Sequence, residues 1–263
     1  GLGVLAANAQ AVVGADRAIA LTPRARVPEV GRALAPQLEW LGDEPLQLLD
    51  SMDDNLDVVV SVLPMGARHT EAIVVRSASG GTIRLEGDLA AALLVSSAVR
   101  LSNGGIAIFV VAPSLVFSDR SILRRLPELN LYVHAALALP ASTFAPTTNL
   151  ATYLLVIGRD MQPGTFVAQL ARDSNTNRQI VENLQSRVVG GPVELGRLVS
   201  LDSFRGVEAV RLAEQLQQTE TRMAVSALPL GDLAKEIRLG RSKDGFAFTP
   251  LEGAIYIPTI GCT

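Results

Sequence analysis

The residues best placed to do chemistry form an apolar strand followed by a tight turn, Asp57–Gly66. Three consecutive valines, Val58–Val60, suit a parallel strand that is covered on both faces of its sheet. Pro64 and Gly66 end the strand, because proline donates no backbone hydrogen bond and glycine adopts dihedral angles that other residues avoid. In open α/β sheets, ligands bind just beyond the carboxyl ends of such strands. The sequence therefore predicts that a chemical site, if the chain has one, lies at Ser61–Gly66.

Composition limits the kinds of site and partner. The 263 residues are 48% hydrophobic but only 4% aromatic, so the core is aliphatic, and the net charge of −3 gives no global basic character. A free-standing nucleic-acid binder is typically basic. The single cysteine, Cys262, excludes an internal disulfide and a cysteine-based zinc cluster. The two histidines, His69 and His134, lie far apart in the sequence, so we predict no metal site.

Membrane segments are not predicted. The chain has no apolar run of about 18 residues, the length that a membrane-spanning helix needs, and no basic-then-apolar leader. We therefore expect a soluble, cytoplasmic protein without a membrane partner. The abrupt start at Gly1 and the end directly after a strand-like run suggest that both ends are cut from a longer protein.

The first residues carry a weaker signal for nucleotide binding. Gly1 and Gly3 precede an apolar stretch that reaches Asp16. A glycine pair that opens a helix, followed by a strand ending in an acid, suits a nucleotide-binding crossover, but that fingerprint also requires a strand before Gly1. A small strand or hairpin at the domain edge is the alternative. Further on, Pro45–Asp50 is a second short apolar run that ends in an acid.

The middle of the chain alternates strands and helices. A hairpin is predicted over residues 71–85 around Ser79–Gly81. A helix capped by Asp88 or Gly87 is predicted to run to Arg100 and to end in a glycine turn at Ser102–Gly105. Four further strands are predicted at residues 106–111, 132–139, 151–157 and 166–170. This order predicts an α/β fold with a Rossmann-like, mostly parallel sheet. The last two strands have too short a connection for a crossover, which predicts an antiparallel edge strand.

The composition changes after Asp173. Ser174 is expected to cap a helix through Arg187, and Ser203–Ser226 is rich in Glu, Gln, Arg and Leu, as in an exposed helix or a coiled-coil arm. Pro229 begins another unit. We therefore predict three parts, an α/β domain at 1–172, a helical arm at 173–226 and a further segment at 227–263.

The order of several motifs carries a family resemblance. After Asp57–Gly66 come Leu101–Pro113, with its paired glycines and Val-Val-Ala-Pro ending, then Phe117, Leu139–Phe144 and the aliphatic run Thr148–Ile157. Over about residues 45–170 this order resembles the adenine-N6 DNA methylases of type I restriction–modification systems, the modification subunits. The resemblance implies a methyltransferase sheet in 1–172, and 227–263 looks like the entry to a target-recognition segment.

The resemblance places the catalytic turn of the family, Asn-Pro-Pro-Phe or Asn-Pro-Pro-Tyr, on Val62, Leu63, Pro64 and Met65. In that family the asparagine and a proline carbonyl accept hydrogen bonds from the target adenine amino group, and the aromatic ring stacks on the flipped base. This chain keeps the second proline but has no asparagine and no aromatic residue there. Valine cannot accept a hydrogen bond, so the resemblance implies impaired catalysis. Ser61 replaces the asparagine only if the register shifts by one residue.

The resemblance also implies binding positions. Phe144 matches the second aromatic residue, which holds the flipped base on its other face, although a core phenylalanine at a loop corner explains it as well. Asp16 and Asp50 loosely match the acids that contact S-adenosylmethionine in the family, and strand-end turns or caps are the alternative. S-adenosylmethionine is thus the implied cofactor.

Two functions stay open on this basis. One is an S-adenosylmethionine-dependent DNA adenine-N6 methyltransferase with impaired catalysis, and the other is a non-catalytic DNA- or subunit-binding module on the same fold. Expected partners are DNA, a specificity or restriction subunit, or a second copy bound through the 203–226 helix. Arg120, Arg124 and Arg125 would lie toward DNA, although an exposed helix face is the more usual explanation for such a cluster.

Overall fold

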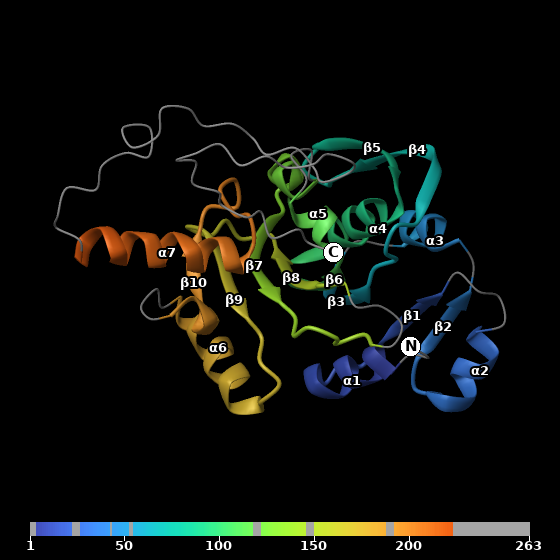
Figure 1. The fold of residues 1–263 in the computed structure, drawn as a ribbon. Coiled ribbons are helices and arrows are strands. Elements are labelled where there is room, and N and C mark those ends of the chain that lie inside the picture. Colours follow the sequence, from blue (N-terminus) through green and yellow to red (C-terminus); the bar gives the residue numbers. More distant parts are fainter. Residues whose placement is uncertain are drawn as a thin grey trace, which may run out of the picture. The chain divides into compact units, whose positions relative to one another are not determined.

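A computed structural model describes residues 4–22, 27–42, 44–52, 55–117, 122–145, 150–187 and 192–222. The chain divides into two units, Gly1–Leu216 and Gln217–Thr263, and the elements below belong to the first unit, apart from the end of the last helix. The centre of this unit is a six-stranded sheet with the order β10-β9-β7-β8-β6-β3 (Figure 1). Its strands are β3 (Leu56–Val62), β6 (Leu101–Val111), β7 (Tyr132–Ala138), β8 (Tyr153–Gly158), β9 (Thr165–Gln169) and β10 (Arg197–Val199).

Most strands of this sheet run in one direction. β3 is parallel to β6 and β7 is parallel to β9, whereas β8 is antiparallel to both its neighbours and β10 is antiparallel to β9. The predicted α/β fold with a mostly parallel, Rossmann-like sheet and an antiparallel edge strand is confirmed. The prediction that the last two strands, 151–157 and 166–170, form an antiparallel pair at the edge is wrong, because β7 lies between β8 and β9 and the antiparallel edge strand is β10. The length of the segment between two strands limits how they can be connected, but it does not determine the order of the strands in the sheet.

Helices cover the two faces of the sheet unequally (Figure 1). On one face, α4 (Leu89–Ala98), α5 (Pro113–Phe117) and the short turns η1 (Ile122–Arg124) and η2 (Leu126–Leu129) enclose the main core with the buried ring of Phe109. On the other face, α6 (Ser174–Ser186) inserts its fully buried Ile180 against Phe166 of β9. Buried side chains alternate between these two cores along β7, β8 and β9, as the two-residue period of a strand requires.

The hairpin and the helix after it are confirmed. β4 (Arg68–Arg76) and β5 (Thr82–Asp88) pair antiparallel. Asp88 then caps α4, its carboxylate accepting hydrogen bonds from the backbone N–H groups of Ala90 (2.9 Å) and Ala91 (3.2 Å).

The predicted glycine turn at Ser102–Gly105 is wrong, because these residues already belong to β6. Neither Gly104 nor Gly105 has a positive φ. A Cβ on Gly105 would lie 2.6 Å from the carbonyl oxygen of Leu56. This glycine therefore allows two strands to approach closely, a role that the sequence pattern does not distinguish from a turn.

The N-terminal residues form a separate small layer. This layer consists of α1 (Val4–Val13), β1 (Ile19–Thr22), α2 (Val27–Leu34) and β2 (Glu39–Gly42), whereas the next helix, α3 (Pro45–Ser51), packs against α4 and the main core. β1 and β2 pair in parallel as a two-stranded sheet of their own. Of the two alternatives for the first residues, the helix followed by a strand describes the structure better than a hairpin at the domain edge. Buried Trp40 holds the layer together, its indole N–H donating to the Ala35 carbonyl at 3.1 Å.

The C-terminal elements pack on the same unit. Asp173, not the predicted Ser174, caps α6 and accepts the N–H of Thr176 at 2.8 Å. The helix predicted at 203–226 is α7 (Val207–Arg222), which follows η3 (Val193–Leu195) and β10. The predicted part 227–263 lies outside the described residues, so the three-part division stays a prediction. Among the described helices none is long and apolar enough to cross a membrane.

Candidate functional site

The predicted turn stands at the carboxyl end of β3. Val62 is the last strand residue and its side chain is 49% exposed, whereas that of Leu63 is only 3% exposed and belongs to the main core. The Leu63 N–H continues the ladder by donating to the Val110 carbonyl at 3.0 Å. Pro64 and Met65 follow, both half-buried, and Gly66 completes the turn with a φ of +72°. The turn therefore offers only backbone groups for hydrogen bonding.

Ser61 does not replace the missing asparagine. It pairs with Phe109, whose ring is fully buried in the core under α4. Because successive side chains of a strand point to opposite faces, the Ser61 hydroxyl lies on the face opposite to Val62. A register shift of one residue would have to turn the whole strand over.

An aromatic cluster lies at the same edge of the sheet. Tyr153 pairs with Val111, next to the Val110 residue that receives the Leu63 N–H. Its ring contacts those of Phe117 edge-on at 5.1 Å and of Phe204 at 6.2 Å between centroids. Sequence reasoning noted Phe117 but missed this cluster, because the three residues come from distant parts of the chain.

The Tyr153 phenol is a structural group. Burial raises its pKa, although the nearby backbone N–H of Val207 opposes this by a hydrogen bond that lowers it. The hydroxyl thus stays protonated and holds the first turn of α7 over the carboxyl edge. Phe204 and Val207 are both almost fully buried there.

Phe144 lies on the same edge but not beside the turn. It is half-buried in a short turn after β7, in which the Thr143 N–H donates to the Pro140 carbonyl at 3.2 Å. β8 and β6 separate β7 from β3, so at about 4.8 Å per strand the two strand ends are about 14 Å apart. The structure thus places Phe144 and the turn along one edge without bringing them into contact.

Neither of the two predicted acids lies at the carboxyl end of a strand. Asp16 is exposed in the loop before β1. Asp50 is in α3, where its carboxylate is 91% exposed and 3.6 Å from the Arg100 guanidinium. The Arg100 carbonyl accepts the N–H of Leu56, the first residue of β3. Asp50 is therefore close to the end of β3 opposite to the turn, and neither acid joins it.

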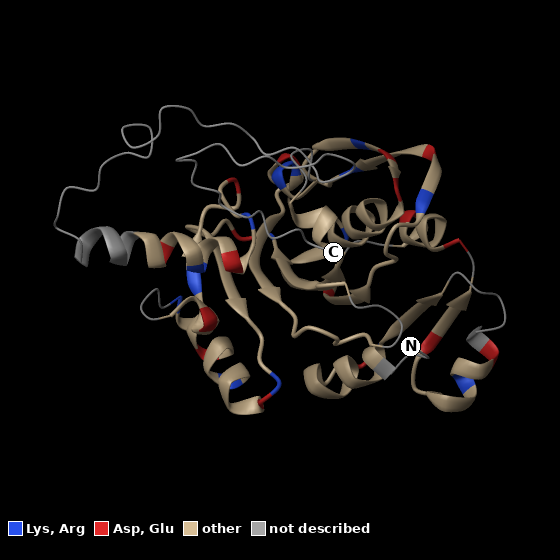
Figure 2. Cartoon of the chain, viewed as in Figure 1, with Lys and Arg blue, Asp and Glu red and all other residues tan. Residues whose placement is uncertain are grey.

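The two described members of the basic cluster, Arg124 and Arg125, form ion pairs. Arg125 donates through two nitrogens to Glu128, at 3.0 and 3.2 Å, and this hydrogen bonding lowers the pKa of the glutamate. Arg124 approaches the Asp202 carboxylate at 3.7 Å, and Arg120 lies outside the described residues. Figure 2 shows that charged residues gather on β4, β5, α6 and α7, while the central strands are nearly free of charge. No group of three metal-binding side chains occurs in the part of the chain described.

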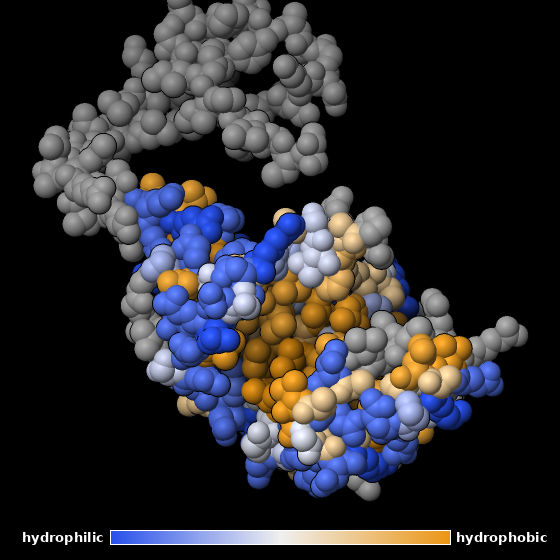
Figure 3. Space-filling view, turned by 90° about the horizontal axis from the view of Figure 1, so that it is seen from below, coloured by the Kyte–Doolittle hydropathy of each residue, from blue (hydrophilic) through white to orange (hydrophobic). Residues whose placement is uncertain are grey.

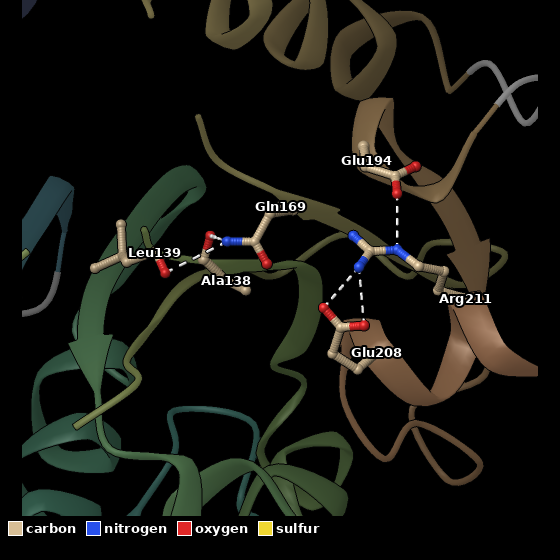
Figure 4. A network of polar contacts seen from close by, with 6 residues as sticks. All are labelled: Ala138, Leu139, Gln169, Glu194, Glu208 and Arg211. Atoms are coloured by element: carbon tan, nitrogen blue, oxygen red, sulfur yellow. Dashed lines mark hydrogen bonds and ion pairs between the residues drawn. The ribbon is translucent and has the colours of Figure 1, made fainter. Parts of the chain in front are cut away.

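A polar network fixes α7 near this edge (Figure 4). Arg211 of α7 donates to Glu194 of η3 at 2.7 Å and to both carboxylate oxygens of Glu208 at 2.8 and 2.9 Å. At the end of β9, the Gln169 amide donates weakly to the carbonyls of Ala138 and Leu139, each at 3.4 Å. These contacts order the edge but leave no free nucleophile or acid–base pair among the residues named here.

Comparisons with known proteins agree with the fold. No family model and no curated protein matches the sequence. Among solved structures, the methyltransferase subunit of a type I restriction–modification system from Streptococcus thermophilus superposes with a TM-score of 0.59 at 14% identity, over 77% of this chain and 49% of that one. The M protein of the type I restriction enzyme EcoKI gives 0.51 at 11% identity, over 82% and 61%.

A third solved structure widens the likeness beyond restriction–modification. A Listeria monocytogenes protein assigned to the class I S-adenosylmethionine-dependent methyltransferases gives a TM-score of 0.52 at 16% identity, over 70% of this chain and 59% of that one. At such identities the likeness establishes the fold alone. The chain spans about half to three fifths of the length of the structures named here.

Proposed function

We propose that this chain is a methyltransferase-fold module of the restriction–modification type in which the adenine-N6 transfer turn is silent, and that it acts by binding another protein chain. Its solved relatives by fold are methyltransferases, among them subunits of type I systems. A module on a catalytic fold can keep the fold and its interfaces after the site has lost its chemistry.

The composition of the turn carries the proposal. An adenine amino group needs an acceptor side chain beside the proline carbonyl and an aromatic ring over the base. This chain offers Val62 and Met65 at those positions, and Leu63 is committed to the core. Loss of one positioned polar group at an active site costs about two to three orders of magnitude in rate. Three of the four positions are altered here.

The described residues do not fit S-adenosylmethionine. Its hydroxyl groups and charged ends need acids and backbone N–H groups at the carboxyl ends of strands. Asp16 is exposed in the loop before β1, and Asp50 is exposed in the helix α3, where it faces Arg100. Gly1 and Gly3 lie outside the described residues. We therefore assign no step to this cofactor.

α7 supplies the binding surface. One side of the helix is fixed by Val207, Arg211 and Glu214, the last through an ion pair with Arg197. The other side presents Leu212 and Leu216, which are 58% and 64% exposed. Together with Ala209 and Ala213, which are also exposed, they form an apolar stripe at helical spacing, the pattern that packs against a second helix. The simplest partner is a second copy of this chain.

Light scattering tests this assignment. We expect the purified chain to form a dimer, and the double substitution Leu212→Glu with Leu216→Glu to shift it to the monomer, because two charges cannot be buried in a helix pair without partners. Val181→Glu is the matched control, since Val181 is an exposed apolar residue of α6. A wild-type chain that is monomeric at every concentration and binds no modification-system subunit would contradict the proposal.

A further inference from the structure

α7 is held against its own unit along one side only. Val207 is almost fully buried, Arg211 donates to Glu194 of η3 at 2.7 Å, and Glu214 pairs with Arg197 of β10. At 3.6 residues per turn, the three α7 positions fall on one side of the helix. The exposed apolar stripe lies on the opposite side and consists of Ala209, Leu212, Ala213 and Leu216. The two ion pairs thus fix the rotation of α7 and turn the stripe away from the unit.

The side chains of this stripe differ in size from one end to the other. Ala209 begins the stripe and Leu216 ends it, about 10 Å further along the helix axis. Leu212 and Ala213 lie between them at nearly the same height. The stripe therefore has a small residue at one end, a large residue at the other, and one of each in the middle.

Two copies of the stripe fit together evenly in one direction only. In a parallel helix pair, Ala209 faces Ala209 and Leu216 faces Leu216, so the two axes would have to approach at one end and separate at the other. In an antiparallel pair, each Ala209 faces Leu216 of the partner copy, and the spacing of the axes stays even. Large side chains pack best when they face small ones. The middle of the stripe is balanced in both directions, so its two ends decide between them.

This self-complementarity identifies a second copy as the partner. A two-fold axis brings the same surface of both subunits together, so that each residue of the pair is matched in both directions. The antiparallel direction also aligns the helix dipoles favourably. It separates the two copies of Glu208, whose side chain is 71% exposed and which would stand at the same height in a parallel pair.

We propose that two copies of this chain associate through an antiparallel pairing of α7, in which Ala209 of each copy packs against Leu216 of the other. This inference rests on the proposed function and adds the direction of the helix pair to it.

Another apolar surface of the unit provides a control. Figure 3 shows a broad apolar area in the middle of the face seen from below. Val62 of β3 and Ile106 of β6 are exposed apolar residues on the sheet face opposite to α4. We expect Val62→Glu to leave the dimer intact, because the pairing uses α7 alone.

Disulfide cross-linking measures the direction of the pair. All chains carry Cys262→Ser, which removes the single native thiol. At the usual axis spacing, facing Cα atoms are about 5 Å apart, a distance that a disulfide spans, whereas it cannot bridge about 10 Å along the axis. We expect an oxidised mixture of Ala209→Cys chains and Leu216→Cys chains to form cross-linked dimers, and each variant alone to form at least about tenfold fewer. A mixture of Val181→Cys and Leu216→Cys chains measures collisional cross-linking.

Charged substitutions provide a second arm that needs no oxidation. In a chain with both Ala209→Lys and Leu216→Glu, an antiparallel pair brings opposite charges together at both ends, whereas a parallel pair brings like charges together. We expect light scattering to give the double variant a dimer dissociation constant at least about tenfold lower than that of either single variant.

The outcomes separate the two proposals. Efficient cross-linking within either cysteine variant alone, or a double charge variant that dimerises no better than the single ones, would overturn the antiparallel pairing and leave the proposed function standing. Loss of the dimer in Val62→Glu would overturn it as well, because it identifies the sheet face as the interface. A wild-type chain that stays monomeric in the same light-scattering series would remove the self-association that the pairing requires.

Discussion

Val62 and Leu63 are neighbours with opposite roles. Leu63 anchors the turn by burying its side chain in the main core and by donating its N–H to Val110. Val62 stands half in solvent at the position to which the sequence resemblance assigns the asparagine of the methylase turn. The turn is thus firmly anchored in the fold, but it has no side chain that can accept a hydrogen bond from a substrate.

Truncation of these two residues separates the roles. Leu63→Ala is expected to destabilise the chain by about 2–5 kcal/mol, because it removes buried methyl groups and leaves a cavity. Val62→Ala is expected to cost less than about 1 kcal/mol, as at other exposed positions. Urea unfolding followed by circular dichroism measures both. Equal losses would show that Leu63 is not the anchor.

His134 links stability to pH. Burial lowers the pKa of its imidazole, and the Asp160 carbonyl, which accepts the Nε2–H at 2.8 Å, only partly opposes this. A histidine whose folded-state pKa is lowered binds fewer protons in the folded chain than in the unfolded one, so stability rises with pH through that window.

We therefore expect the free energy of unfolding to fall as pH drops below about 6.5, where unfolded histidine takes up its proton. His134→Gln keeps a donor for Asp160 without titrating, and its stability should vary less over the same range. Urea titrations between pH 7.5 and pH 5, roughly the range around that value, measure the slope. If the free energy of unfolding depends on pH as strongly in His134→Gln as in the wild type, His134 is not the source of the dependence. Loss of the dependence in the control His69→Gln would also contradict this assignment.

At the scale of elements, the sequence patterns predicted regular segments better than their ends. The hairpin and the Asp88 cap of α4 follow from local turn and capping chemistry. The start of β6 was missed, because paired glycines favour both a turn and a close strand approach. The apolar run that ends at Asp50 was also given no helix. Pro45 is the first residue of a helix, a position that proline favours, so the apolar run is α3 and not a strand.

Two adjacent glycines test the reading of β6. Gly105→Ala is expected to destabilise the chain by about 1–3 kcal/mol, because its Cβ would meet the Leu56 carbonyl at 2.6 Å. Gly104→Ala has nothing within 4 Å of its Cβ, and should be neutral or slightly stabilising. Thermal unfolding of the two variants makes the comparison. Similar melting temperatures would argue that β3 and β6 are not held this close.

At the scale of the whole molecule, the order of motifs along the chain predicted the fold class, while tertiary pairing decided the rest. The interior position of β8, the separate β1–β2 sheet and the aromatic cluster around Tyr153 each depend on residues far apart in sequence. The predicted turn does follow a strand, β3, and its role as a site stays a prediction. In the structure Phe144 lies at the same edge of the sheet as this turn, whereas Asp16 and Asp50 do not.

The central claim is that this turn cannot support transfer to adenine, and a graft tests it most directly. The Asn-Pro-Pro-Phe turn of an active type I modification methylase is replaced by the Val-Leu-Pro-Met sequence of Val62–Met65, and methyl transfer from labelled S-adenosylmethionine to DNA is measured in single turnovers. We predict a rate at least about a hundredfold lower with cofactor affinity retained. A grafted enzyme that transfers methyl groups at nearly the rate of its parent would contradict the claim.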